Sequence, residues 1–139
     1  MSFSRLKNLL FSSPDAGTAA HTRARGAAAE DRALAHLQAA GLRLLERNFR
    51  TPGRGGGEID LILQAPDGTV VFVEVRQRQS ARHGEAAASV SAAKQRRITL
   101  AARHFLLRYS ALPPCRFDVV ALQGDAVEWL PAAFEAADC

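Results

Sequence analysis

The spacing of apolar and polar positions predicts two helices. Residues 26–40 (GAAAEDRALAHLQAA) are rich in helix formers, and Gly41 stands where a C-terminal cap belongs. A second helix is predicted from Ser91, a suitable N-cap, to about Tyr109. The apolar stripe of this helix consists of Ile98, Ala102, Phe105 and Tyr109.

Apolar runs on either side of the second helix predict strands. The runs cover residues 42–50, 58–64, 69–76, 115–122 and 126–130. The turn-forming segment 65–68 (APDG) joins the second and third runs, and Gly124-Asp125 joins the last two. The order helix, three strands, helix, two strands predicts an α/β fold in which helices flank a mixed sheet.

The first residues differ in character from the rest. Residues 1–25 carry four Lys and Arg against Asp15, and the apolar run Leu9-Leu10-Phe11 is too short for a signal peptide. We expect a flexible basic tail over residues 1–22 and a single domain over 23–139, because 139 residues fit one hydrophobic core.

Two further observations bear on location. No apolar run is long enough to cross a membrane, so we expect no membrane association. The spacing of Cys115 and Cys139 matches no zinc or redox motif, and a reducing compartment suits such cysteines. We therefore expect a cytoplasmic protein.

A net charge of +4 hides a strong asymmetry along the chain. Residues 76–108 hold eight Lys and Arg against Glu85 alone, whereas residues 110–139 hold five acids against Arg116. A basic block beside an acidic end suggests a face that binds a polyanion. A solvated helix rich in arginine has the same composition, and charge alone does not choose between the two.

Two carboxylates stand out on neighbouring predicted strands. If the hairpin closes about Asp67, Asp60 lies opposite Glu74 and Glu58 lies opposite Arg76. Facing carboxylates repel each other and need a cation or a shared proton. Oxygen donors without histidine or cysteine at ligand spacing favour Mg²⁺.

Each acid also has a purely structural interpretation. Asp60 alone is typical of a solvent-facing edge strand, and Glu74 alone of a cross-strand partner to an arginine. Glu30 shares a helical face with Leu34 and Leu37, where an unpaired carboxylate is costly, but it also lies in the first turn, where an acid favours the helix dipole. Asp60 and Glu74 together favour a site, and Glu30 adds a third carboxylate.

These segments resemble the PD-(D/E)XK nuclease core. The resemblance rests on residues 57–62 (GEIDLI) and 72–76 (FVEVR). A fuller pattern, over about residues 26–134, resembles the YraN-type bacterial family, which is related to archaeal Holliday-junction resolvases. It adds Gly26, Glu30, 48–50 (NFR), 94–98 (KQRRI), 116–120 (RFDVV) and 133–134 (AF). The resemblance implies a restriction-endonuclease-like mixed β-sheet flanked by helices.

The resemblance also implies a chemistry. It predicts metal-dependent hydrolysis of phosphodiester bonds in DNA, branched or otherwise structured, with Mg²⁺ or Mn²⁺ as cofactor. Asp60 and Glu74 would bind the metal, with the carbonyl of Val75 as a third ligand. Glu30 would orient or deprotonate the attacking water. By the same analogy a homodimer is expected.

One position departs from the superfamily pattern. Arg76 stands where lysine is usual, and arginine stays protonated and cannot act as a base. It can still stabilise charge on a phosphate, or it can be neutralised by Glu58. Lys94 at the start of the second helix is a candidate to supply the missing amine, unless it is an ordinary exposed lysine.

Phosphate contacts are predicted from the basic block. The candidates are Arg54, Arg78, Arg82, Lys94 and Arg97. Aromatic residues make up only 6% of the chain, so a stacking platform for single strands is not evident. The competing hypotheses are a nucleic-acid-binding module that does not cleave and a protein-interaction module with a vestigial site. Metal binding by Asp60 and Glu74 separates the nuclease from both.

Overall fold

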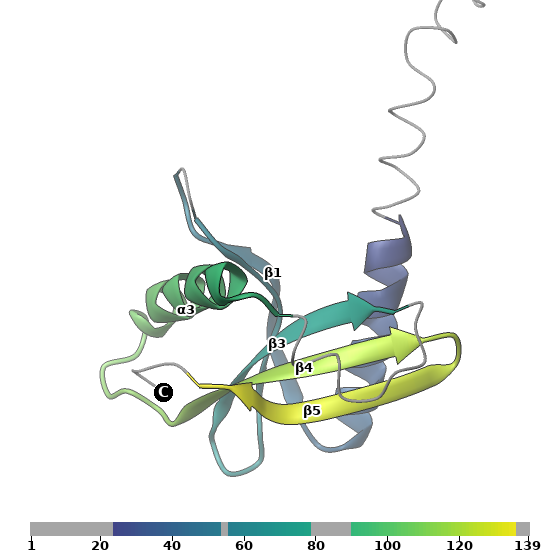
Figure 1. Cartoon of the computed structure of the whole chain (residues 1–139). Helices are drawn as coiled ribbons and strands as arrows, with labels where there is room; N and C mark the ends of the chain where they lie inside the picture. The colour runs from purple at the N-terminus through teal and green to yellow at the C-terminus, as the bar shows by residue number, and fades with distance from the viewer. Residues whose placement is uncertain (1–23, 54–55, 79–89, 136–139) are drawn as a thin grey trace, which may run out of the picture.

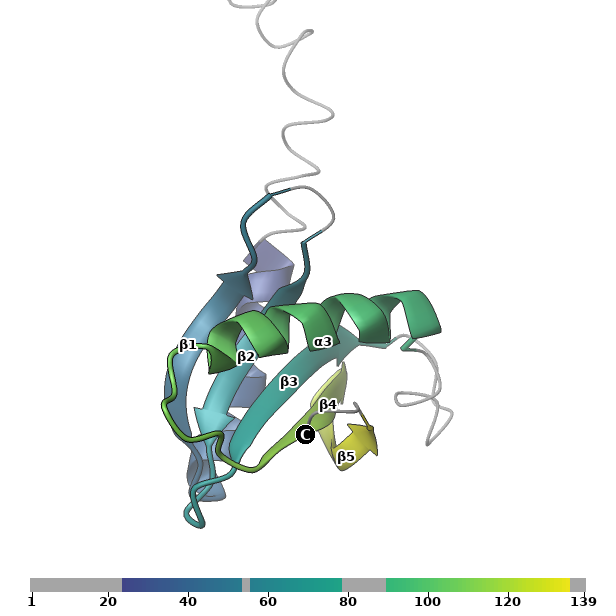
Figure 2. The same ribbon diagram turned by 90° about the vertical axis from the view of Figure 1, so that its left-hand side faces the viewer.

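A five-stranded mixed sheet between helices forms the body of the molecule (Figures 1 and 2). The computed structural model describes residues 24–53, 56–78 and 90–135. The expected tail over residues 1–22 lies outside these ranges. Within them, no helix is long and apolar enough to cross a bilayer. The predicted α/β class and the predicted order of elements are both confirmed.

The strands lie in chain order across the sheet. They are β1 (Arg43–Arg50), β2 (Glu58–Gln64), β3 (Val70–Gln77), β4 (Cys115–Gln123) and β5 (Ala126–Phe134). Neighbouring strands pair antiparallel except β3 and β4, which are parallel because α3 (Ala92–Leu106) carries the chain back along the sheet between them.

The N-terminal helix covers the sheet face opposite α3 and is described over residues 24–39. Gly41, with φ +100°, ends this helix as predicted: its N–H bonds to Gln38 and the next N–H bonds to Leu37. The buried side chains are Ala29, Ala33 and Leu37. The predicted face through Leu34 and Leu37 packs on the sheet: Leu37 is fully buried, and Leu34 is partly buried beside the alanines.

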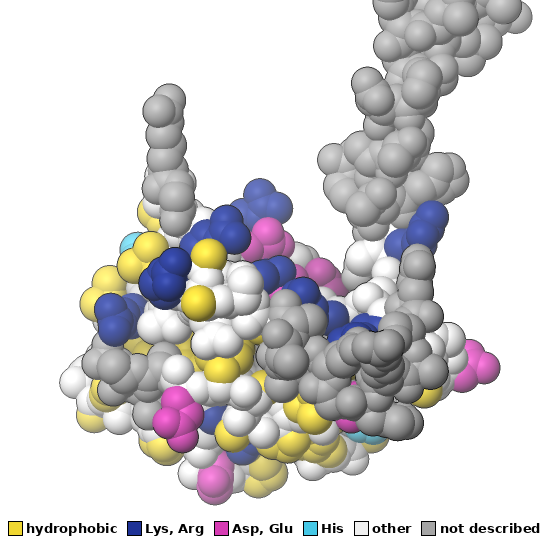
Figure 3. Space-filling view, viewed as in Figure 1, with side chains coloured by type: hydrophobic (Ala, Val, Ile, Leu, Met, Phe, Trp, Pro, Cys, Tyr) yellow, Lys and Arg dark blue, Asp and Glu magenta, His cyan; other side chains and the backbone are white. Residues whose placement is uncertain are grey.

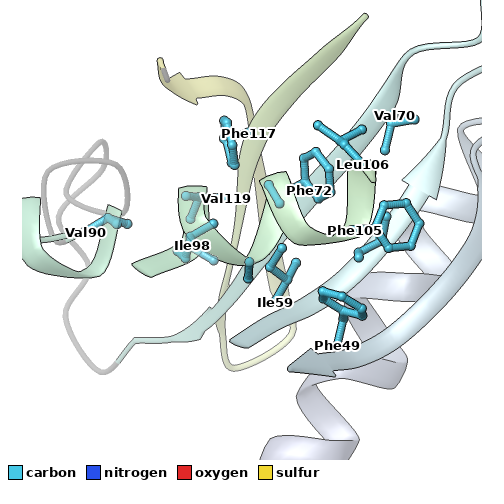
Figure 4. Close-up of a cluster of buried hydrophobic side chains, with 14 residues drawn as sticks. Phe49, Ile59, Val70, Phe72, Val90, Ile98, Phe105, Leu106, Phe117 and Val119 are labelled. Carbon is cyan, nitrogen blue, oxygen red and sulfur yellow. The ribbon is translucent and has the colours of Figure 1, made fainter. Parts of the chain in front are cut away.

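The other face of the sheet packs against α3, as Figure 4 shows. Ser91 caps this helix by accepting a hydrogen bond from the Lys94 backbone N–H at 3.1 Å. Phe105 packs edge-on against Phe49 and Phe72, with ring centroids 5.4 and 6.0 Å apart. The helix ends at Leu106, earlier than predicted, although Tyr109 still packs on the core.

Both faces of the central strands are therefore buried. The second cluster lies under the N-terminal helix and contains Leu61, Leu63, Val71, Val73, Val120 and Leu122. In the part of the chain that the structure describes, the buried polar or charged residues are Glu74 and Asp118. A carboxylate in such a place needs hydrogen bonds or a cation.

Asp118 has a structural role between β4 and β5. It accepts hydrogen bonds from Trp129 Nε1 and the Ala132 N–H, both at 2.9 Å, and from Arg116 Nε at 3.0 Å. β5 continues through Pro131, where we predicted its end, because an outer strand tolerates a proline. The pairing shifts there, and Ala132 adopts φ +50°.

Candidate active site

The structure brings Asp60 of β2 and Glu74 of β3 side by side. Leu61 lies opposite Val73 in the ladder, so the two acids occupy the next position on each strand. This is the register expected for a hairpin closed about the 65–68 turn. Both carboxyl groups line the same pocket.

The regular pairing of β2 with β3 ends next to Asp60. Its Oδ2 accepts a hydrogen bond from the Val75 backbone N–H at 2.8 Å, so a side chain binds a main-chain donor of β3. Ile59 and Ile62 belong to the same buried cluster, which strict alternation does not allow. The prediction that residues 58, 60 and 62 share one face was therefore wrong. On β1, Asn48 with φ +52° lies between the residues that pair with Leu61 and Ile59, and this irregularity accompanies the change.

The charges around Glu74 define the electrostatics. Its side chain is only 6% exposed, and its Oε2 lies 2.5 Å from Lys94 Nζ and 3.6 Å from Arg76. Among the described residues this oxygen accepts no hydrogen bond with suitable geometry. A buried carboxylate oxygen that is balanced by cations rather than by directional donors suits a site that binds a cation.

Asp60 titrates in a different range from an ordinary aspartate. Burial, and then the neighbouring Glu74 carboxyl group, raise its pKa to about 8, whereas the Val75 N–H works in the opposite direction. At neutral pH Asp60 therefore holds a proton unless a cation replaces it.

The expected pairing of Glu58 with Arg76 was wrong. Glu58 forms an ion pair with Arg50 of β1 at 3.4 Å, and Arg76 reaches Glu74. The ladder between β2 and β3 stops at Leu61 and Val73, so beyond the acids the strands no longer hold their side chains opposite each other.

An open pocket of about 290 Å³ surrounds the acids. It is lined by Gly56, Gly57, Glu58, Asp60, Glu74, Lys94, Arg97 and Ile98. We call it the carboxylate pocket. The prediction that Lys94 reaches the acids agrees with this geometry: α3 begins at Ala92, and its first turn points the lysine at Glu74.

Gly57 sets one wall of the carboxylate pocket. A side chain at this position would overlap the carbonyl group of Arg97 on α3. Only glycine lets the loop between β1 and β2 approach the helix so closely. No local pattern in the sequence predicts this packing role, because it depends on the distant helix α3.

Glu30 lies beside the carboxylate pocket rather than in it. Arg47 of β1 holds it at 3.3 Å and also contacts Asp31 at 2.8 Å. The negative charge of Glu30 repels the ionised form of Asp60 and so adds to the rise in the pKa of Asp60. Arg47 was missed, because only the packing of the N-terminal helix against β1 shows that it positions Glu30.

The predicted phosphate-binding residues do not all lie at the carboxylate pocket. Arg97 and Lys94 line the carboxylate pocket, whereas Arg78 follows β3 and does not line it. Arg54 and Arg82 lie outside the described residues. Val75 is adjacent to Asp60 through its N–H. In the described ranges, His, Cys, Asp and Glu do not form a cluster of three able to hold a metal, so a metal here would draw on two carboxylates.

A mixed sheet between helices, with paired acids on its central hairpin, makes this an α/β protein whose fold is consistent with the restriction-endonuclease-like class. Residues 29–122 match the family described as Uncharacterised protein family UPF0102. The chain belongs to the UPF0102 family.

High identity to bacterial relatives supports this assignment. A UPF0102 protein of Paracidovorax citrulli is 72% identical over 115 residues, which are 83% of this chain and 85% of the relative. One from Albidiferax ferrireducens is 70% identical over 111 residues, covering 80% and 87%. Another, from Acidovorax sp. JS42, is 66% identical over 116 residues, covering 84% and 88%.

Proposed function

We propose that this protein is a metal-dependent endonuclease that hydrolyses phosphodiester bonds in DNA, within the PD-(D/E)XK superfamily. The observation that carries the proposal is that Asp60 and Glu74 lie side by side on β2 and β3 and line one open pocket with basic walls. Two adjacent acids are electrostatically unfavourable in a purely structural role, and a divalent cation relieves the repulsion.

The donors fit Mg²⁺ or Mn²⁺. Asp60 and Glu74 would hold the ion with carboxylate oxygens, and the backbone carbonyl of Val75 is the further donor implied by the resemblance. Glu74 Oε2 is buried and faces Lys94 Nζ at 2.5 Å, so a metal ion would take over the position of this ammonium group. When bound, the ion supplies positive charge that stabilises the phosphoryl group and makes nearby water more acidic.

Side chains around the acids have complementary tasks. Arg97 has an exposed side chain in the carboxylate pocket and binds a phosphate oxygen of the substrate. Lys94 neutralises Glu74 in the free protein, and its amine can donate a proton toward the leaving oxygen. Arg76 stays protonated and adds positive charge beside Glu74. Glu30, fixed by Arg47, orients water at the edge of the pocket.

The test is cleavage of labelled four-way-junction, flap and plain duplex DNA with Mg²⁺ or Mn²⁺. We expect metal-dependent cuts with the native protein and a loss of at least about 100-fold in rate for Asp60→Asn and for Glu74→Gln. Glu58→Gln is the matched control, since Glu58 lines the same pocket but pairs with Arg50. Cuts that persist in both ligand variants would rule out this active site.

A second function is favoured by the contact between Lys94 and Glu74. An ammonium group 2.5 Å from Oε2 occupies the place where a metal would bind, and Arg76 replaces the usual lysine. These two features suit a nucleic-acid-binding module that does not cleave. Calorimetry with Mn²⁺ separates the functions, because only the nuclease needs a metal site that disappears in Asp60→Asn.

A further inference from the structure

Two adjacent arginines on α3 point to different sides of the helix. Arg96 and Arg97 are exposed, and within the described ranges neither takes part in an ion pair. No acid lies in the first turn of α3, although an acid there would favour the helix dipole. Cations near the start of a helix face the positive end of the helix dipole, which lowers stability. An external anion bound by these arginines would offset this effect.

The neighbours of the two arginines place them on opposite flanks of α3. Arg97 lines the carboxylate pocket together with Gly57 and Glu58 at the start of β2. Arg96 lines a second groove of about 540 Å³, which reaches Glu135 just after β5. β2 and β5 lie on different sides of β3 in the sheet, so α3 forms a ridge between two hollows.

The second groove has basic and apolar walls. It is lined by Ala92, Gln95, Arg96, Thr99, Leu100, Arg103 and Glu135. The polar groups of Gln95 and Thr99 already serve the helix, since Gln95 donates to the Val90 carbonyl and Thr99 to the Gln95 carbonyl. Arg96 and Arg103 are the cations that line the groove, and Arg96 forms no ion pair with a described residue. Figure 3 shows Lys and Arg side chains gathered over α3 on this face.

The width of the ridge indicates the partner. An α-helix with its side chains is about 10–12 Å wide, and the major groove of B-form DNA is about 12 Å wide. The A-form major groove of RNA is too narrow and deep for a helix, and a single strand offers one backbone rather than two. A helix seated in a groove with phosphates close to both flanks therefore fits the B-form major groove.

We infer that α3 straddles the two strands of a DNA duplex, with Arg97 on the backbone entering the carboxylate pocket and Arg96 on the opposite backbone. This inference rests on the proposed function, because it takes the carboxylate pocket as the place of the scissile phosphate. If the inference holds, the substrate is double-stranded B-form DNA where α3 binds.

Fluorescence anisotropy without divalent metal tests the inference on the full chain. The probes are a DNA duplex, one of its single strands and an RNA duplex of the same sequence. For Arg96→Glu we expect at least about a fivefold loss of duplex DNA affinity and less than about a twofold change for the single strand. Arg97→Glu weakens both. Arg32→Glu, on the exposed face of the N-terminal helix, is the control and leaves both unchanged.

The outcomes distinguish the inference from the function beneath it. Equal losses on duplex and single strand for Arg96→Glu, no loss on duplex, or equal binding of the RNA duplex would each overturn the straddling arrangement while leaving the nuclease proposal intact. Native protein that binds none of the probes overturns the inference, and the cleavage assay on branched DNA then decides the nuclease proposal. Thermal melts of each variant confirm that the exposed substitutions leave the fold unchanged.

Discussion

Asp60 shares its surroundings with Glu74, and its proton competes with any cation that binds there. Burial and the adjacent carboxyl group raise its pKa from an ordinary 3.8 to about 8. Between these two values the folded protein holds a proton that the unfolded chain has released. The contribution of this group to stability is therefore full below pH 3.8 and is lost as the pH rises through about 8.

The pH dependence of unfolding follows from this sign. In EDTA, urea denaturation should show that the native protein loses about 1–3 kcal/mol more than Asp60→Asn does between about pH 5 and pH 8. Glu58→Gln should keep the native slope, because Glu58 is an exposed acid paired with Arg50. Parallel curves for native protein and Asp60→Asn would show that Asp60 ionises as an ordinary aspartate.

Lys94 is the cation nearest to Glu74 among the described residues, at 2.5 Å, and its side chain is 41% exposed. Without Lys94 the two acids keep Arg76 but lack their closest positive charge. Lys94→Met should therefore lower the melting temperature in EDTA and enlarge the rise that Mn²⁺ produces, because the metal no longer competes with the ammonium group.

The matched control for that experiment is Arg97→Met. Arg97 lines the same pocket, but among the described residues it forms no ion pair with Glu74. Its replacement should leave the Mn²⁺-induced rise close to the native one. An equal rise in the native protein and Lys94→Met would show that the lysine does not occupy the cation position.

At the scale of elements, the packing of Gly57 against α3 fixes the width of the carboxylate pocket. A methyl group on Gly57 would overlap the Arg97 carbonyl, so either the loop or the helix must move. Gly57→Ala should lower the free energy of unfolding by about 1–3 kcal/mol and weaken DNA binding through Arg97. Urea denaturation and anisotropy measure the two effects.

A glycine without neighbours provides the comparison. At Gly26 in the N-terminal helix a Cβ atom would meet nothing within 4 Å. Gly26→Ala should keep or raise stability by up to about 1 kcal/mol, since alanine is the better helix former. A Gly57→Ala protein as stable as Gly26→Ala would mean that the loop is not seated on α3.

The elements were largely predictable, because their signals are local. Gly41 and Ser91 mark helix ends through their own backbone chemistry, and the alternation in β3 places Phe72 and Glu74 on one face. The end of β5 was not predictable in this way. Pro131 normally ends a strand, and only the position of β5 at the outside of the sheet allows it to continue.

The site was predictable in part. Turn symmetry placed Asp60 beside Glu74, but the partners of Glu58 and Arg76 depend on a bend in β2 that no local pattern announces. The Arg47–Glu30 pair, the fit of Gly57 against α3 and the second groove all depend on helix-to-sheet packing. Such interactions join distant segments, which a pattern of spacings cannot place.

At the scale of the whole molecule, the uneven distribution of charge predicts that the proposed DNA binding depends on salt. Eight Lys and Arg lie in residues 76–108, whereas residues 110–139 are acidic. Salt cations compete with the basic side chains for each DNA phosphate, so log K should fall linearly with log salt, with a slope of about −3 to −5. Titrations at several NaCl concentrations measure this slope.

Single substitutions show which basic residues contribute to the salt dependence. Arg97→Glu should make the slope shallower by about one, and Arg32→Glu should leave it unchanged. Affinity that does not depend on salt would remove the electrostatic basis for nucleic-acid binding and favour the protein-interaction hypothesis.

The outer edge of β5 affects whether the sheets of two copies can pair. An unpaired outer strand normally offers a regular row of donors and acceptors on which a strand of another molecule can build a continuous sheet. Pro131 contributes no N–H to that row, and the turn of the backbone at Ala132 breaks its repeat. These two features disfavour edge-to-edge pairing of β5 with a strand of another copy.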